Sequence, residues 1–323
     1  MISIENKELG IIYKFLNMTL EEVVLRFKEK PYLLEVGKGK LSKWFKCSQD
    51  TIVEARRMVK YNSSTISSKP KVLIFDVETA PMQAYVWGRW KQNISLDATI
   101  SEWFMICWSA KWLYSNEIIS DVLTSEEAIN EDDSRIVKHL WELIDEADVI
   151  CAYNGRHADV KWMNSRFIIH NLKPPKPYFL IDPCYTAKQS FGFSSNKLDA
   201  LAGYFGIPHK METNFKLWKD CLAGDSVALN YMSTYCSQDI KILEEVYLKL
   251  RPWIKGHPNM GNLESTDEHT CSFCSSKNIE PIKNKYYYTS IGKYQLYRCA
   301  DCGGVSRGRV NLNKNIKVIN TAR

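Results

Sequence analysis

Two acidic side chains close an apolar stretch of the sequence, KVLIFDVETAP at residues 71–81. Because successive side chains of a strand point to opposite faces, Asp76 and Glu78 would lie side by side where a buried strand ends. Two carboxylates so close repel each other unless a positive group lies between them. The pair therefore indicates a metal site, although an acid after a strand can equally form a turn or cap a helix.

Two further acidic residues stand where they could complete such a site. Asp159 lies in AYNGRHAD, between a predicted strand and the next predicted helix, and Asp239 lies in YCSQDIKIL, inside a predicted helix. Tyr235 precedes Asp239 by one helical turn, so the two share one helical face. Carboxylate oxygens select Mg²⁺ or Mn²⁺ over zinc. Two such ions, about 4 Å apart, can bind the attacking and leaving oxygens in the hydrolysis of a phosphodiester.

Three segments, FDVETAP, AYNGRHADVKWMNSRF and YCSQDIKIL, resemble the three exonuclease motifs of the DnaQ-like, or DEDD, nuclease superfamily. The resemblance covers residues 71–255 and implies a ribonuclease H-like fold. The third motif has the form Tyr-x-x-x-Asp, which is similar to the tyrosine subgroup, because the histidine of the other subgroup would fall at Thr234. Within the superfamily the chain is most similar to the YprB-like proteins.

The resemblance also implies a role for each acidic residue of the motifs. Asp76, Glu78 and Asp239 would hold the ion that activates water. Asp76 and Asp159 would hold the second ion, which supports the leaving oxygen. Tyr235 would orient the attacking water and the scissile phosphate. The cofactors implied are therefore two Mg²⁺ (or Mn²⁺) ions.

Four neighbouring positions bear on how the motifs work. Asn154 and Arg156 would contact the substrate strand, although Asn154 could equally brace its own loop. Ala158 stands where the superfamily usually has an aromatic residue, which removes a packing contact rather than a ligand. Tyr231, one helical turn before Tyr235, is the alternative candidate for the tyrosine of the third motif.

Four cysteines near the end of the chain form two C-x2-C pairs, Cys271 with Cys274 and Cys299 with Cys302. In a reduced compartment, paired C-x2-C motifs are typical of a four-thiolate structural zinc site. The segment between the pairs would form a hairpin around residues 290–292, as in a zinc ribbon with one structural Zn²⁺. His269 could compete as a ligand, but four thiolates already complete the tetrahedron. The remaining cysteines are scattered and are expected to be buried free thiols.

The elements expected to position these residues alternate between strands and helices. Strands are predicted at 71–77, 148–154 and 178–182, and the aromatic-rich stretch 84–114 is predicted to form the remaining strands of a hairpin or meander. Helices are predicted at 134–147, 160–172, 196–207 and 225–254. This order predicts an α/β fold, a ribonuclease H-like mixed sheet with flanking helices. The expected domains are a helical domain at 1–61, a linker at 62–70, an exonuclease domain at 71–258, and a zinc ribbon with a basic tail at 259–323.

The segment LSKWFKCSQDTIVEARR, residues 41–57, is similar to a helix-turn-helix. Arg56 and Arg57 would then face a DNA groove or its phosphates. Lys46 stands where the turn commonly has glycine, so a plain helical interaction module is the alternative. In that motif Leu41 and Phe45 would lie on the first helix, Cys47 in the turn and Ile52 on the second helix.

The net charge of +6 is unevenly distributed along the chain. Residues 1–69 carry +5, residues 70–270 carry −7, and residues 271–323 carry +8. Two basic ends around an acidic middle suit a catalytic core with flanking segments that attract a polyanion, although basic ends can be merely solvated. No apolar run is long enough to span a membrane and the N-terminus lacks a secretory pattern, so we expect a cytoplasmic protein.

These observations predict a metal-dependent 3′–5′ exonuclease that hydrolyses terminal phosphodiesters of nucleic acid by a two-metal mechanism, with DNA as the favoured substrate. The direction of digestion is implied by the resemblance. One alternative is a nucleic-acid-binding protein that no longer cuts, which the presence of all four carboxylates and Tyr235 counts against. The other is an endonuclease or RNA-processing nuclease on the same fold, and no residue distinguishes ribose from deoxyribose.

Overall fold

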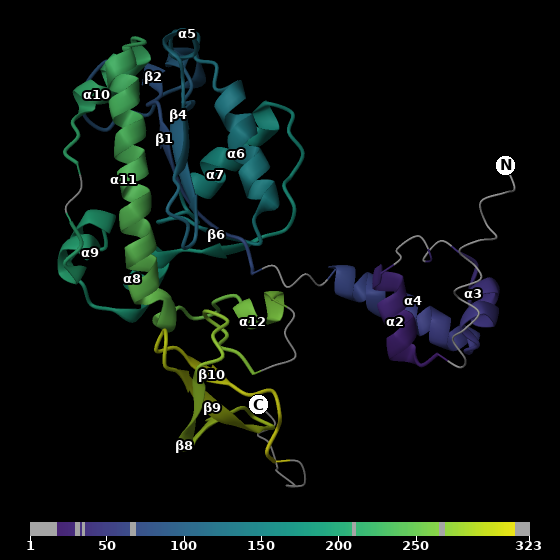
Figure 1. Ribbon diagram of the computed structural model, residues 1–323. Coiled ribbons are helices and arrows are strands. Elements are labelled where there is room, and N and C mark those ends of the chain that lie inside the picture. Colours follow the sequence, from purple (N-terminus) through teal and green to yellow (C-terminus); the bar gives the residue numbers. More distant parts are fainter. Residues whose placement is uncertain are drawn as a thin grey trace, which may run out of the picture. The chain divides into compact units, whose positions relative to one another are not determined.

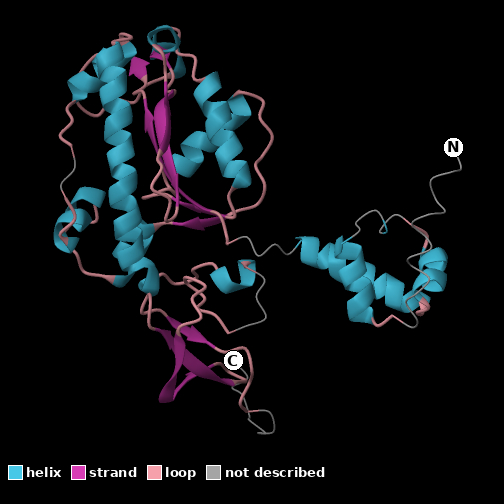
Figure 2. Cartoon of the chain, in the orientation of Figure 1, coloured by secondary structure: helices cyan, strands magenta, loops and turns pink. Residues whose placement is uncertain are grey.

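The structure is a computed structural model that describes residues 18–29, 33, 36–64, 69–208, 211–264 and 269–313, without the side chains of 28 and 57–64. The chain divides into two compact units, Met1–Ser68 and Lys69–Arg323, which are treated separately below. Figures 1 and 2 show their elements. The side chain of Arg57 and the end of the basic tail, residues 314–323, lie outside the described residues.

The first unit is helical, as predicted. Its helices are α2 (Leu20–Glu29), α3 (Lys38–Phe45) and α4 (Gln49–Ser64). Leu41 and Phe45 on α3 and Ile52 on α4 are buried, whereas Cys47 between the two helices is half-buried. Lys46 takes the left-handed conformation between α3 and α4, with φ 49°. Helix α4 continues through Ser64, into the segment predicted as a linker.

The second unit is built on a mixed five-stranded sheet of order β5-β4-β1-β6-β7. Its strands are β1 (Val72–Thr79), β4 (Met105–Trp112), β5 (Ile119–Val122), β6 (Val149–Cys151) and β7 (Phe179–Ile181). Strands β1, β4 and β5 pair antiparallel, whereas β6 and β7 join β1 in parallel. The central strand β1 is therefore paired along both edges, and its first residues are fully buried.

Helices cover both faces of this sheet, which confirms the predicted α/β fold. Helices α6 (Ser134–Glu146) and α7 (Asp159–Ile169) lie on one side of β1 and β4, and the long helix α11 (Ser226–Leu250) lies on the other (Figure 1). The amphipathic pattern of α6 is as predicted, with Ile136, Leu140 and Ile144 in the core. Among the described residues, no helix is both long and apolar enough to cross a membrane.

Three short helices were not expected: α5 (Ser125–Ile129), α8 (Pro183–Ser190) and α10 (Phe215–Leu222). Each depends on a capping side chain rather than on a long apolar stripe. Asp182 accepts a hydrogen bond from the Tyr185 amide at 3.1 Å and starts α8, and Asn214 accepts one from the Lys216 amide at 3.0 Å. The predicted helix at 196–207 is present as α9 (Leu198–Phe205).

The aromatic-rich stretch 84–114 is only partly strand, which corrects the expectation. The two-stranded pair β2 (Gln83–Ala84) and β3 (Thr99–Ser101) frames a loop that contains the short 3-10 helix η2 (Leu96–Ala98). Only β4 enters the main sheet. Aromatic composition favours strands when the side chains are buried, and in this loop they are exposed.

After α11 the chain passes through η3 (Arg251–Trp253) and α12 (Met260–Leu263) to a three-stranded antiparallel sheet of order β10-β9-β8. Its strands are β8 (Ile279–Tyr288), β9 (Lys293–Cys299) and β10 (Val305–Arg307). The turn between β8 and β9 lies at residues 289–292, as predicted, and is closed by the Thr289 amide bonded to the Gly292 carbonyl at 2.9 Å.

Candidate active site

Three of the predicted carboxylates meet at the junction of β1 and α11. Asp76 and Glu78 lie two residues apart on β1, and Asp239 projects from α11, which packs on that strand. One oxygen of each lies within 4.8 Å of the others. Asp239 is buried, whereas Asp76 and Glu78 are half-buried. Carboxylate oxygens gathered in this way form a donor set for a hard divalent cation.

Asp159, the fourth predicted carboxylate, lies beside this cluster but is not one of its three members. It is the first residue of α7, and its Oδ1 accepts a hydrogen bond from the Val77 amide, between Asp76 and Glu78, at 3.4 Å. Burial raises the pKa of Asp159 to about 6, since the charged form loses its hydration. A cation at the neighbouring carboxylates would favour the charged form.

Tyr235 lies one turn before Asp239 on α11 and is buried, with 6% of its surface exposed. Tyr231, the alternative, is 40% exposed, and its hydroxyl donates to the Glu212 carbonyl at 3.0 Å. The hydroxyl of Tyr231 is thus hydrogen-bonded to the loop before α10.

A buried thiol donates a hydrogen bond to the acidic cluster. Cys236 Sγ lies 3.6 Å from Asp76 Oδ2 and donates to it. Burial raises the pKa of Cys236, which keeps the thiol protonated and able to donate. Cys107, opposite Glu78 in the pairing of β1 with β4, is also fully buried. The prediction that the remaining cysteines are buried free thiols is confirmed for all of them except Cys47, which is half-buried. The contact of Cys236 with the cluster was not predicted.

Asn154 and Arg156 lie in the loop between β6 and α7, and both are held through their backbone. Asp182 accepts from the Asn154 amide at 3.0 Å and from the Arg156 amide at 3.3 Å. Asn154 takes the left-handed conformation with φ 59°, so the loop is a tight turn. The Arg156 guanidinium lies over the Tyr185 ring at 5.1 Å. Asn154 also lines an open cleft together with Lys188.

A buried ion pair that the sequence did not reveal fixes α7 against the sheet. Asp133 is fully buried and accepts two hydrogen bonds from Arg166, from Nε and Nη2, each at 2.6 Å. The Met105 amide at the start of β4 donates to the same carboxylate at 2.8 Å, and His170 Nε2 lies 2.5 Å from it. The pair thus joins α6, α7 and β4 behind the segment that carries Asp159.

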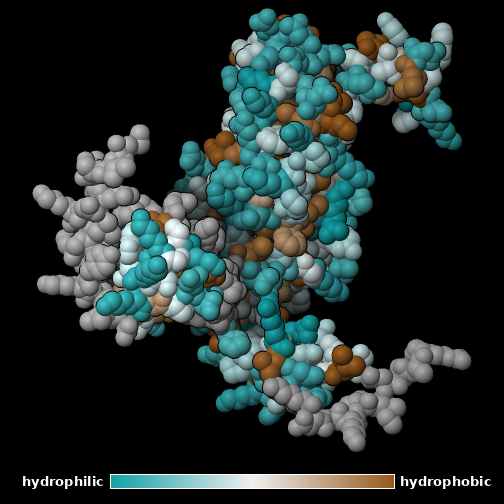
Figure 3. Space-filling model, turned by 90° about the vertical axis from the view of Figure 1, so that its right-hand side faces the viewer, coloured by the Kyte–Doolittle hydropathy of each residue, from teal (hydrophilic) through white to brown (hydrophobic). Residues whose placement is uncertain are grey.

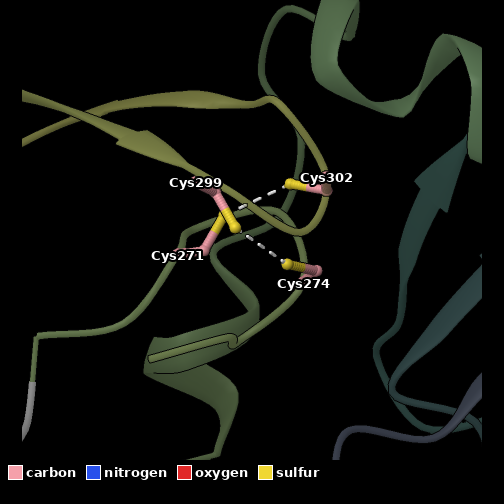
Figure 4. Close-up of side chains that lie close together, drawn as sticks. All are labelled: Cys271, Cys274, Cys299 and Cys302. Atoms are coloured by element: carbon pink, nitrogen blue, oxygen red, sulfur yellow. Dashed lines mark hydrogen bonds between the residues drawn. The ribbon is translucent and has the colours of Figure 1, made fainter. Parts of the chain in front are cut away.

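The four predicted cysteines converge in a second cluster (Figure 4). The Sγ atoms of Cys271 and Cys302 are 3.6 Å apart and those of Cys274 and Cys299 are 3.7 Å apart. A zinc ion with sulfur ligands at about 2.3 Å has tetrahedral edges of about 3.8 Å, so the spacing fits that geometry. Hydrogen bonding from the Cys274 thiol lowers the pKa of Cys271 to about 5. The cluster is therefore compatible with a zinc ribbon.

His269 is not part of this cluster, because its ring stacks on Tyr297 with 5.9 Å between the ring centres. Gly303 has φ 75°, a conformation that favours glycine, in the turn after Cys302. A side chain at Gly304 would collide with the Phe273 ring.

The comparisons with known proteins concern this second unit. A family model described as RNase_H superfamily matches residues 103–251. The fold is ribonuclease H-like. The matched range contains Asp159, Tyr235 and Asp239, and it begins after β1, which carries Asp76 and Glu78. Ribonuclease H-like nucleases use divalent metals, so the match and the acidic cluster support a nuclease of this fold acting on nucleic acid.

Among solved structures, the family B DNA polymerase of the archaeon Pyrobaculum calidifontis is similar, with 14% sequence identity and a TM-score of 0.42. The similarity covers 58% of this chain and 26% of the polymerase. No curated protein matches the sequence.

Proposed function

We propose that the protein is a metal-dependent 3′–5′ exonuclease of the DnaQ-like tyrosine subgroup, acting on DNA. The observation that carries the proposal is the convergence of Asp76, Glu78 and Asp239 within 4.8 Å, with Asp159 and Tyr235 beside them. These five residues come from three segments of the chain. Packing alone does not require four acidic side chains, two buried and two half-buried, in one place.

Asp76, Glu78 and Asp239 would hold one Mg²⁺ or Mn²⁺, and Asp76 with Asp159 would hold a second. Ions bound there would stabilise the charge of the transition state and lower the pKa of an attacking water. The negative charge of the carboxylates repels the phosphate, so the phosphate can bind only where cations lie between it and the carboxylates. The Tyr235 hydroxyl would hydrogen-bond the water or the scissile phosphate and orient it.

Four thiolates would hold one structural Zn²⁺ at the C-terminal sheet. We also propose that this sheet contacts the substrate strand. Lys293 lies over the Tyr286 ring at 3.9 Å, and Arg307 lies over Tyr287 at 5.1 Å and Tyr294 at 4.8 Å. Cations stacked on aromatic rings are a surface suited to a nucleic acid strand.

The test of the exonuclease is cleavage of end-labelled single-stranded DNA, duplex DNA and RNA in Mg²⁺ or Mn²⁺. We expect stepwise shortening from the 3′ end, reduced by at least about 10³-fold in Asp76→Asn, because the substitution removes a charge shared by both ions. Glu142→Gln, at an exposed position of α6, is the matched control and should keep full activity.

Other outcomes would assign the site differently. Products that begin with internal cuts would indicate an endonuclease, and digestion confined to RNA would indicate an RNA-processing enzyme. Binding of nucleic acid without cleavage in either metal would refute the proposal in favour of a binding protein.

The zinc is tested separately by measuring the metal content of the purified protein. We expect one zinc per chain, and none in the double variant Cys271→Ser, Cys299→Ser, since two thiolates cannot complete the tetrahedron. Cys47→Ser, which changes a half-buried thiol of the first unit, should retain the zinc. A double variant that keeps its zinc would show that the metal binds elsewhere.

A further inference from the structure

The loop between β2 and β3, residues 85–98, exposes large aromatic and aliphatic side chains; we call it the tryptophan loop. Trp87 and Trp90 have relative exposures of 105% and 85%, so they make almost no contact with the rest of the protein. Tyr85 and Leu96 are also largely exposed. In Figure 3 the viewed surface is mostly hydrophilic, with hydrophobic residues in isolated patches. Large exposed hydrophobic side chains gathered in one segment indicate a surface that binds something.

The tryptophan loop has a defined base. Gln83 pairs with Ser101 and Ala84 with Thr99, and the Tyr85 amide donates to the Ala98 carbonyl at 2.9 Å. Within the loop, the Gln92 side chain donates to the Trp90 carbonyl at 2.7 Å. The loop thus holds its exposed rings on a small closed hairpin.

The base of the hairpin is tied to the strand that carries two of the site's carboxylates. Five peptide steps separate Glu78 from Gln83, which limits the distance between their Cα atoms to at most about 18 Å. The Ala80 amide, between them, donates to the Phe104 carbonyl at 2.8 Å and anchors the connection to the chain that enters β4. Figure 1 shows β2 beyond the end of β1. A nucleic acid strand bound at the acidic site could therefore also reach the tryptophan loop.

The charge of the loop is opposite to that of its surroundings. Within the loop the charged residues are Arg89, Lys91 and Asp97, a net charge of +1, whereas residues 70–270 as a whole carry −7. Both cations alternate in sequence with the exposed tryptophans. The single acid, Asp97, lies at the base of the loop, where its carboxylate accepts a hydrogen bond from the Ser95 hydroxyl. Exposed rings interleaved with cations suit a partner that is both aromatic and anionic, which describes unpaired nucleotides.

We propose that the tryptophan loop binds the unpaired bases of the substrate strand, which stack on Trp87 and Trp90 while Arg89 and Lys91 contact its phosphates. The proposal rests on the proposed function for its substrate class. It adds a site for the strand outside the carboxylate cluster, on a segment that holds none of the expected metal ligands.

The test is binding of a fluorescent single-stranded oligonucleotide, followed by anisotropy without added Mg²⁺ or Mn²⁺ and without a chelator. Base stacking on one ring contributes about 1–3 kcal/mol, so Trp87→Ala and Trp90→Ala should each weaken binding roughly 5- to 150-fold. Neither change should affect folding, because both rings are exposed. Trp253→Ala, an exposed tryptophan of η3, is the matched control and should leave binding unchanged.

Two further variants separate stacking from other kinds of binding. The double variant Trp87→Leu, Trp90→Leu keeps an apolar surface but cannot stack, so it should weaken oligonucleotide binding as the alanine variants do. The double variant Trp87→Phe, Trp90→Phe should retain most of the binding. The double variant Arg89→Gln, Lys91→Gln should lower the slope of log Kd against log salt concentration by about 1.4, as expected for two lost phosphate contacts to a single strand.

Unchanged oligonucleotide binding in the double alanine variant would overturn the proposal, and so would wild-type binding by the leucine variant. A wild-type dimer that becomes monomeric in the alanine variant, with unchanged oligonucleotide affinity, would assign the loop to self-association instead. Tryptophan-dependent binding combined with an absence of cleavage would refute the proposed exonuclease and leave this inference standing.

Discussion

Removing the cation of the buried Arg166–Asp133 pair should destabilise the second unit more than any change of a surface ion pair. In Arg166→Met the apolar stem is kept, and the Asp133 carboxylate, which has no exposed surface, loses two charge-assisted hydrogen bonds of 2.6 Å. Breaking a buried pair by removing one partner costs about 3–5 kcal/mol. The Met105 amide and His170 still bond the carboxylate, so we expect the lower end, about 3 kcal/mol.

The measurement is urea unfolding followed by far-ultraviolet circular dichroism, compared between variants with equal metal content. Lys176→Met is the control, since Lys176 is 73% exposed and its ion pair with Asp145 lies on the surface. Such an exposed pair contributes little to stability, because water screens it. A double variant, Asp133→Asn with Arg166→Met, should lose less than the sum of its single changes, by at least about 1 kcal/mol, because both remove the same interaction.

Equal stabilities of Arg166→Met and Lys176→Met would refute this reasoning, as would strict additivity in the double variant. Either result would mean that α7 is held by its apolar contacts alone. The buried acid would then have no part in fixing the helix that begins at Asp159.

Two other predictions concern backbone strain and acid stability. Gly224→Ala should lower the free energy of unfolding by about 2 kcal/mol or more, because φ is +75° and the new carbon would lie 2.9 Å from the backbone carbonyl oxygen of Ser125. Gly206→Ala, with φ +70° and open space around it, should cost only about 1 kcal/mol. Equal losses in thermal unfolding would contradict the steric part of this prediction. Burial lowers the pKa of His257 to about 4 from its ordinary 6.5, so the folded state binds fewer protons between these values and stability should fall by about 3 kcal/mol as the pH drops from 6.5 to 4. His257→Gln should remove that part of the pH dependence, and an unaltered difference between pH 7 and pH 4 would show that other groups cause it.

Local patterns predicted the parts of the site that depend on one element. The alternation of a strand placed Asp76 and Glu78 on one face, and the helical turn placed Tyr235 beside Asp239. The C-x2-C spacing likewise predicted which thiols converge. The strand and helix relations, and the spacing within each C-x2-C pair, span a few residues and follow from the repeat of a strand, a helix or a tight turn. The convergence of the two cysteine pairs followed instead from the tetrahedral set of four ligands that zinc requires.

Relations between distant segments could not be read from the same patterns. Asp133 and Arg166 are 33 residues apart, and Cys236 and Asp76 are 160 apart, so their contacts depend on how whole elements pack. The exposure of the tryptophan loop could not be predicted from the sequence for another reason. Aromatic composition is the same whether rings are buried in a sheet or exposed on a hairpin, and only the surrounding chain decides which.

The paired edges of β1 have a consequence for how this protein can change over generations. Because β4 and β6 occupy both sides of the strand, and α11 covers one face, the carboxylates belong to a part of the molecule that tolerates few insertions. The hairpin at 85–98 and the cysteine-bearing sheet are attached where the chain leaves that part. Selection, or an engineer, could therefore exchange these attachments and redirect the protein to new targets while its acidic centre is inherited intact.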